Sequence, residues 1–382
     1  MNISRTEKLM SFWLNDKKNE LLLQELLTSI SQHKEFEIYA KAYSEIPFDQ
    51  IKSQAVHASA VELLIQSGQT ASAKQHLVTY QLILSQWCIY FNALIQFKES
   101  NFDGCIETFS NFPADSKILA MTYTLCARAH YMSGEIELAK LVLDKYITNH
   151  VNAEALGLYA MCWLDLGNYE HAEEFANNAI QEFEYQLDAL LALASCALAK
   201  HEIALAEKYV GKCLQINPYV GRVWSLAGQI DLYHAQYNNA VIAFEKAVTF
   251  MPNHIGTYHL LAWTYLIIDE LEKAELQFQS ALELNPSFAD SHAGLAIIEL
   301  NREKLDEANK LIKKSLRLDP NSFTAHYAQS LLSAKNGNEA SAKQMIERIL
   351  NSKSHVNELT YQQLIEKSMK IISERSGKYN EH

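Results

Sequence analysis

The stretch "GRVWSLAGQIDLYHAQYNNAVIAFEKAVTFMP", residues 221–252, contains two apolar patterns with helical spacing, separated by a short polar turn. Ala240, Phe244 and Ala247 follow at steps of four and three residues, so they form one stripe on a helix. A second apolar set begins upstream at Trp224. Neither helix can bury its stripe alone, so the stretch predicts a pair of amphipathic helices, with Pro252 ending the second.

This pair recurs along the chain with a step of 34 residues. Four prolines keep the step, at Pro218, Pro252, Pro286 and Pro320. Alanines keep it over six units, at Ala172, Ala206, Ala240, Ala274, Ala308 and Ala342. A small side chain lets two helices cross closely, and a leucine there would cost about 1–3 kcal/mol through overpacking. The repetition predicts stacked helix pairs rather than two or three ordinary globular domains.

At these positions the sequence resembles the tetratricopeptide repeat family, whose unit has an aromatic residue, Leu-Gly, Tyr, Ala, Phe, Ala and Pro at fixed places. Residues 221–252 match at Trp224, Gly228, Tyr237, Ala240, Phe244, Ala247 and Pro252. The unit from 255 matches at Tyr258, Leu261, Tyr265, Leu271, Ala274, Phe278, Ala281 and Pro286. The resemblance implies an all-α, right-handed α-solenoid of helix-turn-helix repeats, with about nine units and the strongest match over residues 153–322.

The 34-residue repeat, which we call the frame, divides the chain into four expected segments. Residues 1–50 are predicted to be helices outside the frame, compatible with one degenerate repeat. Residues 51–152 are weaker repeats and residues 153–352 are well-framed repeats. Residues 353–382 are predicted to be a capping helix and tail, because "VNELTYQQLIEKSMKIISERS" (356–376) has the polar outer side that the end of an array requires.

Composition excludes some function classes. The net charge of −12 argues against nucleic-acid binding, which normally needs a basic face. Six cysteines without paired spacing suit a reducing compartment, and no signal peptide or membrane-spanning stretch is evident, so we expect a cytoplasmic protein without membrane insertion. Charge is uneven, with ten acids and three bases in residues 153–220, but eight acids and nine bases in residues 289–352.

Motifs that would indicate an enzyme or a cofactor are missing. The sequence contains no GxGxxG, P-loop, GxSxG or HExxH pattern, so we expect no catalytic residues, no cofactor and no metal site. Cys126 and His130 are spaced to share a metal, but two ligands make a poor site and core packing is the better interpretation. A basic row predicts either a solvated helix face or a docking patch for an acidic partner: Lys310, Lys313, Lys314 and Arg317.

The resemblance also implies where a partner would bind. In this family the first helix of each unit lines the concave side, and peptides lie along it. Carried over to this sequence, the groove residues are Glu154, Met161, Asp188, Leu191, Ser195, Arg222, Gln229, His259, Trp263, Asp290 and Ile297. Trp263 is the sharpest single candidate, either as an interface anchor or as a side chain buried against the next unit. The family's carboxylate clamp would need Lys, Asn and Arg at these places, and here they are mostly apolar or acidic.

We therefore expect a non-enzymatic protein-interaction scaffold. Its partner would be a protein segment, extended or helical, with apolar anchors and basic residues. The leading interpretation is an adaptor or a chaperone-like assembly factor, of the secretion or pilus type in a bacterium. The alternative is a regulatory module that senses a peptide or partner, and an unrecognised enzyme is the least favoured. The sequence leaves the partner's identity and the oligomeric state open.

Overall fold

The computed structural model describes residues 4–85, 87–109, 119–147 and 152–353, together with residues 360, 362, 363 and 366. Within these residues the chain is helical, and its one extended pairing is an isolated bridge between Lys353 and Thr360. The predicted all-α class is confirmed. The chain forms two compact units, Met1–Cys162 and Trp163–His382. The predicted capping segment 356–376 lies mostly outside the described residues.

The first unit is built around one large apolar cluster that includes Trp13, Tyr39 and Phe91. Polar caps define the starts of its first two helices, because the Ser4 and Asn19 side chains accept from free backbone N–H groups. Its helices are α1 Arg5–Asn15, α2 Glu20–His33, α3 Phe36–Tyr43, the short 3-10 helix η1 Phe48–Gln50, α4 Gln54–Gln66, α5 Thr70–Thr79, α6 Gln81–Leu84, α7 Trp87–Lys98, α8 Phe102–Phe109, α9 Leu119–Met132 and α10 Ile136–Ile147. The following helix, α11 Ala153–Asp165, includes the residues where the two units meet in sequence.

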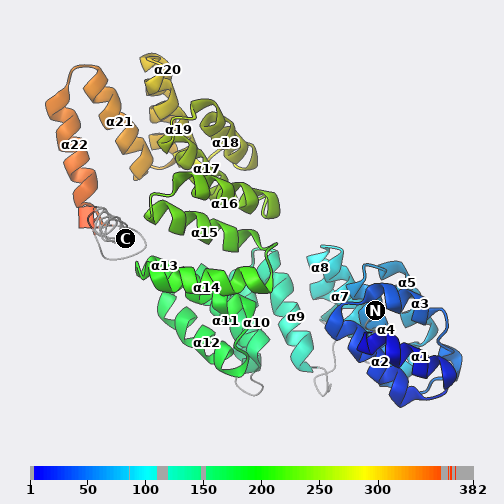
Figure 1. Cartoon of the computed structure of the whole chain (residues 1–382). Coiled ribbons are helices and arrows are strands. Elements are labelled where there is room, and N and C mark those ends of the chain that lie inside the picture. The colour runs from blue at the N-terminus through cyan, green and yellow to red at the C-terminus, as the bar shows by residue number, and fades with distance from the viewer. Residues whose placement is uncertain are drawn as a thin grey trace, which may run out of the picture. The chain divides into compact units, whose positions relative to one another are not determined.

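The second unit is a series of helix pairs whose starts keep the predicted 34-residue step. First helices are α13 Leu187–Ala199, α15 Gly221–Tyr233, α17 Ile255–Ile267, α19 Ala289–Asn301 and α21 Phe323–Lys335. Second helices are α12 Tyr169–Glu182, α14 Ile203–Ile216, α16 Tyr237–Phe250, α18 Leu271–Leu284, α20 Leu305–Leu318 and α22 Glu339–Asn351. Figure 1 shows these pairs following one another from green to orange.

A residue in the left-handed region makes the turn between the two helices of each pair. Gly167 and Gly337 have φ of 78° and 81°, a conformation that glycine readily adopts. The equivalent places are held by His201, Ala235, Asp269 and Glu303, with φ between 54° and 65°. Glycine adopts this conformation without steric strain, whereas the other residues pay a local penalty. The frame, rather than the glycine itself, therefore fixes the turn.

The repeated alanines occupy the closest helix crossings. Ala172, Ala206, Ala240, Ala274 and Ala308 are completely buried, and Ala342 is 4% exposed. The same close packing appears at Gly228 of α15, where a Cβ atom would lie 2.7 Å from the Phe244 ring of α16. Each second helix also packs on the next first helix, as α16 does on α17 and α18 on α19. These contacts join neighbouring pairs, and Trp263 and Leu266 pack on two successive apolar clusters.

Most neighbouring first helices of the second unit contact one another directly. α13 contacts α15, α17 contacts α19, and α19 contacts α21. They therefore form a shared surface, which we call the first-helix face. No helix in the described part of the chain combines the length and apolar character needed to cross a lipid bilayer.

Candidate functional site

The predicted groove residues all lie on first helices, but they differ in accessibility. Glu154 is exposed. Seven are half-buried, namely Asp188, Ser195, Arg222, Gln229, His259, Trp263 and Asp290. The remaining three are at most 6% exposed, namely Met161, Leu191 and Ile297. Those three apolar side chains belong to the core, so the surface that a ligand can reach at these positions is mainly polar.

An open depression of about 320 Å³ lies on the first-helix face. It is lined by Gln229, Leu232 and Tyr233 of α15 and by Leu260 of α17. The two leucines are partly buried and supply an apolar floor. Tyr233 forms a hydrogen bond of 3.0 Å between its hydroxyl and Nδ1 of His201, which holds the phenol in place. Burial raises the pKa of Tyr233, so its hydroxyl keeps its proton.

Only Gln229 of these four residues was among the predicted binding positions. Tyr233 was missed, although the sequence carried a signal for it. Its equivalents at the 34-residue step are Ala199, Ile267 and Asn301, so this position varies in chemistry while its neighbours repeat. A position whose residue varies between repeats is not required for packing and is therefore available for binding. Tyr233 stands at such a position.

Arg222, one of the predicted groove residues, forms an ion pair in the structure. Its Nη1 and Nη2 lie 3.1 and 2.5 Å from the two carboxylate oxygens of Asp165. This is the planar, two-point geometry that gives strong Arg–carboxylate pairs. Burial, followed by the charge of Arg222, lowers the pKa of the neighbouring His254. The pair neutralises Arg222, so this cation does not recruit an acidic ligand on its own.

Trp263 lies half-buried between two repeats. Its ring packs against the apolar cluster around Phe278 and also against the cluster that contains Ile297. Its Nε1 donates to Nε2 of His259 at 2.9 Å. The His259 ring sits edge-on to Phe278 and Phe288, and burial lowers its pKa to about 4. Trp263 therefore packs between repeats and keeps some accessible surface, and its use as an interface anchor stays a prediction.

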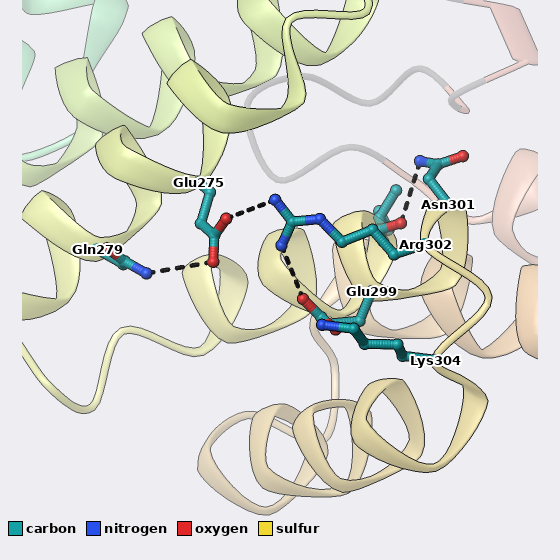
Figure 2. Close-up of polar contacts among 7 residues, drawn as sticks. Glu275, Gln279, Glu299, Asn301, Arg302 and Lys304 are labelled. Carbon is teal, nitrogen blue, oxygen red and sulfur yellow. Dashed lines mark hydrogen bonds and ion pairs between the residues drawn. The ribbon is translucent and has the colours of Figure 1, made fainter.

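A charged network links the repeats at the turn after α19 (Figure 2). Arg302 Nη2 lies 2.7 Å from Oε2 of Glu275 in α18, and its Nη1 lies 3.0 Å from Oε1 of Glu299. Lys304 adds a contact of 3.3 Å to Glu299. Hydrogen bonds to the two carboxylates raise the pKa of Arg302. Each group in the network is matched by an opposite charge, so its role is to join repeats.

Burial suppresses the reactivity of the cysteines whose pKa is raised. All six cysteines are free thiols, and burial raises the pKa of Cys105 and Cys213 to about 12. Such thiols stay protonated at neutral pH and are poor nucleophiles. Among the described residues no group of three or more His, Cys, Asp or Glu side chains is placed to hold a metal. His130, considered as a ligand with Cys126, instead contacts Glu135 through Nδ1 at 2.7 Å.

Comparisons with known proteins point to one repeat family. The sequence model of the tetratricopeptide repeat matches residues 260–323. No curated protein sequence matches the chain. Among solved structures, Pseudomonas aeruginosa PilF is similar, with 18% identity, a TM-score of 0.43, and coverage of 52% of this chain and 90% of its own.

Two further solved structures are similar at the same level. YrrB, described as a tetratricopeptide repeat protein with an unusual peptide-binding site, has 19% identity, a TM-score of 0.39 and coverage of 49% of this chain and 97% of its own. A tetratricopeptide repeat protein from Parabacteroides merdae has 16% identity, a TM-score of 0.44 and coverage of 65% and 98%. These values are too low to transfer a function or partner. Residues 260–323 are therefore tetratricopeptide repeats, and the helix pairs on either side of them continue the same architecture at the same step.

Proposed function

We propose that this protein is a non-enzymatic scaffold that binds a segment of a partner protein over α15 and α17. A tetratricopeptide fold implies a protein-interaction scaffold, and the finer role that we propose is a cytoplasmic adaptor or chaperone-like assembly factor. The free, buried cysteines are compatible with a reducing compartment.

The depression lined by Gln229, Leu232, Tyr233 and Leu260 is the observation that carries the proposal. Its leucine floor suits one apolar side chain of a partner, such as leucine or phenylalanine. The Gln229 amide and the Tyr233 hydroxyl can orient the backbone around that anchor, because peptide groups need hydrogen-bond partners when they leave water. A small apolar site with a few polar groups at its rim is typical of peptide recognition.

Charge around the depression favours basic residues beside the anchor. Residues 163–288 hold sixteen acids and six bases. Arg222, one of the six, is neutralised by Asp165. A partner segment with an apolar anchor and flanking lysines or arginines would therefore be attracted to this part of the chain.

Capture of partners from native lysate, compared between two charge-adding variants, tests the proposal. Leu260→Glu places a carboxylate in the depression, and we expect it to lose the captured partner. Ile242→Glu is the matched control, because Ile242 is 52% exposed on the second helix α16. Circular dichroism checks that both variants fold. If Leu260→Glu retains the same partner at the same yield as wild type, the depression is not the binding site.

A further inference from the structure

The second helix α20 carries four cations on one face, and these cations have no role in the fold described so far. Lys310, Lys313, Lys314 and Arg317 follow at steps of three, one and three residues, so they share a side of the helix. All four are exposed. None of them forms an ion pair with any carboxylate in the part of the chain that the structure describes. We call these four residues the basic face.

Other cations of the same unit are placed differently. Most of those on the neighbouring repeats contact a carboxylate within ion-pair distance, as Lys200, Lys212, Arg222, Lys273, Arg302, Lys304 and Lys335 do. Lys246 instead lies over the Trp224 ring, 3.9 Å from its centre. Among the described residues, the basic face is therefore a local concentration of unmatched positive charge, in a chain with a net charge of −12.

The charges on the basic face repel one another along the helix. Lys310 and Lys314 are four residues apart, as are Lys313 and Arg317, and like charges at this spacing destabilise a helix. Arg317 stands in the last turn of α20, where the helix dipole favours a cation, but the other three lie further from that end. An anionic ligand would reduce this repulsion, so part of its binding free energy would come from the weaker repulsion between the cations of α20.

The basic face also has a shape that can receive a side chain. Lys310, Lys313 and Arg317 surround a shallow depression of about 490 Å³, and the fourth residue that lines it is Leu316. Leu316 is partly buried and packs on the apolar cluster beneath. Three cations around one leucine match a ligand that has several carboxylates and one apolar residue.

We infer that the basic face docks a carboxylate-rich segment of a partner protein, at a second site on α20 that is independent of the depression between α15 and α17. Charge complementarity selects this occupant. A long nucleic acid would have to approach a strongly acidic chain, whereas a short acidic segment can contact the basic face alone. The apolar floor at Leu316 adds a contact that an inorganic anion or a phosphate backbone would not use.

Fluorescence anisotropy with a labelled peptide of Glu-Glu-Leu repeats tests the inference on the full-length chain. We expect saturable binding that weakens as salt is raised, and loss of about tenfold or more in affinity for the variant Lys310→Glu/Lys313→Glu/Arg317→Glu. The control Lys98→Glu/Lys208→Glu/Lys343→Glu makes the same change in net charge at exposed lysines on three other helices, and we expect its affinity to stay within about twofold of wild type.

Four comparisons decide the outcome. The milder variant Lys313→Gln/Arg317→Gln is expected to weaken binding as well, which excludes unfolding of the charge-reversed protein as the cause. Equal losses in the variant and the control would mean that net charge alone governs binding, and would overturn the inference. Stronger binding of duplex DNA or inorganic phosphate than of the acidic peptide, or salt-sensitive self-association abolished by the variant, would also overturn it.

Discussion

Arg302 at the end of α19 holds Glu275 of the preceding repeat, with 2.7 Å between Nη2 and Oε2. The same two places in the frame recur through the unit. Lys200 pairs with Glu173, and His234 lies 3.9 Å from Glu207. At the next step the two places are held by Val241 and Ile268, which both pack on the apolar cluster around Phe278. One inter-repeat position thus accepts either an ion pair or an apolar pair.

This equivalence predicts the outcome of exchanging one kind of pair for the other. Glu275→Val and Arg302→Ile, made singly, are each expected to lower the free energy of unfolding by about 1 kcal/mol. The first removes one of the two carboxylates that Arg302 contacts, and the second leaves the partly buried Glu275 without its cation. The double variant is expected to recover most of that loss, as an apolar pair does at Val241 and Ile268. Urea unfolding of the four proteins measures the cycle.

The double variant tests whether this inter-repeat position accepts either an ion pair or an apolar pair. If it is as unstable as the sum of the single variants, the two places are not interchangeable, and the packing of Val241 and Ile268 depends on other features of its repeat. Raising the salt concentration should reduce the difference between wild type and the single variants only slightly, because the Arg302 and Glu275 side chains are about one quarter exposed.

The repeat frame could be predicted from the sequence because close packing leaves little choice. Ala240 and Ala274 are completely buried, and any larger side chain there would force two helices apart. The same step places the turns, because Gly167, Asp269, Glu303 and Gly337 follow one another at multiples of 34 residues and all four have positive φ.

The binding surface could be predicted only in part, because one side of a first helix faces both a neighbour and solvent. Ile297 and Trp263 occupy the same place in successive repeats, yet Ile297 is 6% exposed while the larger Trp263 keeps some accessible surface. Whether such a side chain is covered depends on the size of its neighbours, such as Leu331 of the next first helix, which a repeat pattern does not specify.

Two glycines in helices provide a direct test of this packing. A Cβ atom at Gly228 would lie 2.7 Å from the Phe244 ring, whereas a Cβ atom at Gly211 would meet nothing within 4 Å. Gly228→Ala is therefore expected to lower stability by about 1–3 kcal/mol through overpacking. Gly211→Ala is expected to raise it by about 0.5–1 kcal/mol, since alanine favours the helix. Thermal unfolding followed by circular dichroism compares them, and a stabilised Gly228→Ala would contradict the tight crossing.

Trp263 is expected to be a structural residue as much as a binding residue. Trp263→Ala should destabilise the protein by about 2 kcal/mol, less than a fully buried tryptophan would, because its ring packs on two clusters but is only half-buried. Trp263→Phe keeps most of the apolar area and loses the hydrogen bond to His259, so we expect a loss of about 1 kcal/mol. Urea unfolding measures both, and an alanine variant as stable as wild type would show that the ring does not hold the repeats together.

A chain of hydrogen bonds in the first unit fixes the protonation of two histidines. Nε2 of His57 lies 3.2 Å from the carbonyl oxygen of Ile51, which can only accept, so this nitrogen carries the proton. Nδ1 of His57 then accepts from Nε2 of His76 at 2.9 Å, and Nδ1 of His76 accepts from the Tyr43 hydroxyl at 2.9 Å. Every group in the chain is satisfied while both imidazoles are neutral.

Acid is therefore expected to destabilise the first unit. Burial, with the charge of His57 as a smaller cause, lowers the pKa of His76 to about 4, from 6.5 for an unperturbed histidine. Burial also lowers the pKa of His57, an effect that the Ile51 carbonyl and the charge of Glu20 oppose. Between pH 6.5 and about pH 4, His76 binds a proton in the unfolded chain but not in the folded chain. The contribution of His76 to the free energy of unfolding is thus fully present above pH 6.5 and falls as the pH is lowered toward 4.

The contribution of His76 to this loss is expected to reach up to about 3 kcal/mol. Urea unfolding followed by tryptophan fluorescence, to which the fully buried Trp13 of the same unit contributes, measures the part that is lost between about pH 7 and pH 5, about 2 kcal/mol. His76→Gln should be less stable than wild type at neutral pH but should lose less stability on acidification. The exposed His33 provides the matched control, and His33→Gln should keep the wild-type pH dependence. An unchanged acid response in His76→Gln would show that the buried histidine chain is not what limits stability at low pH.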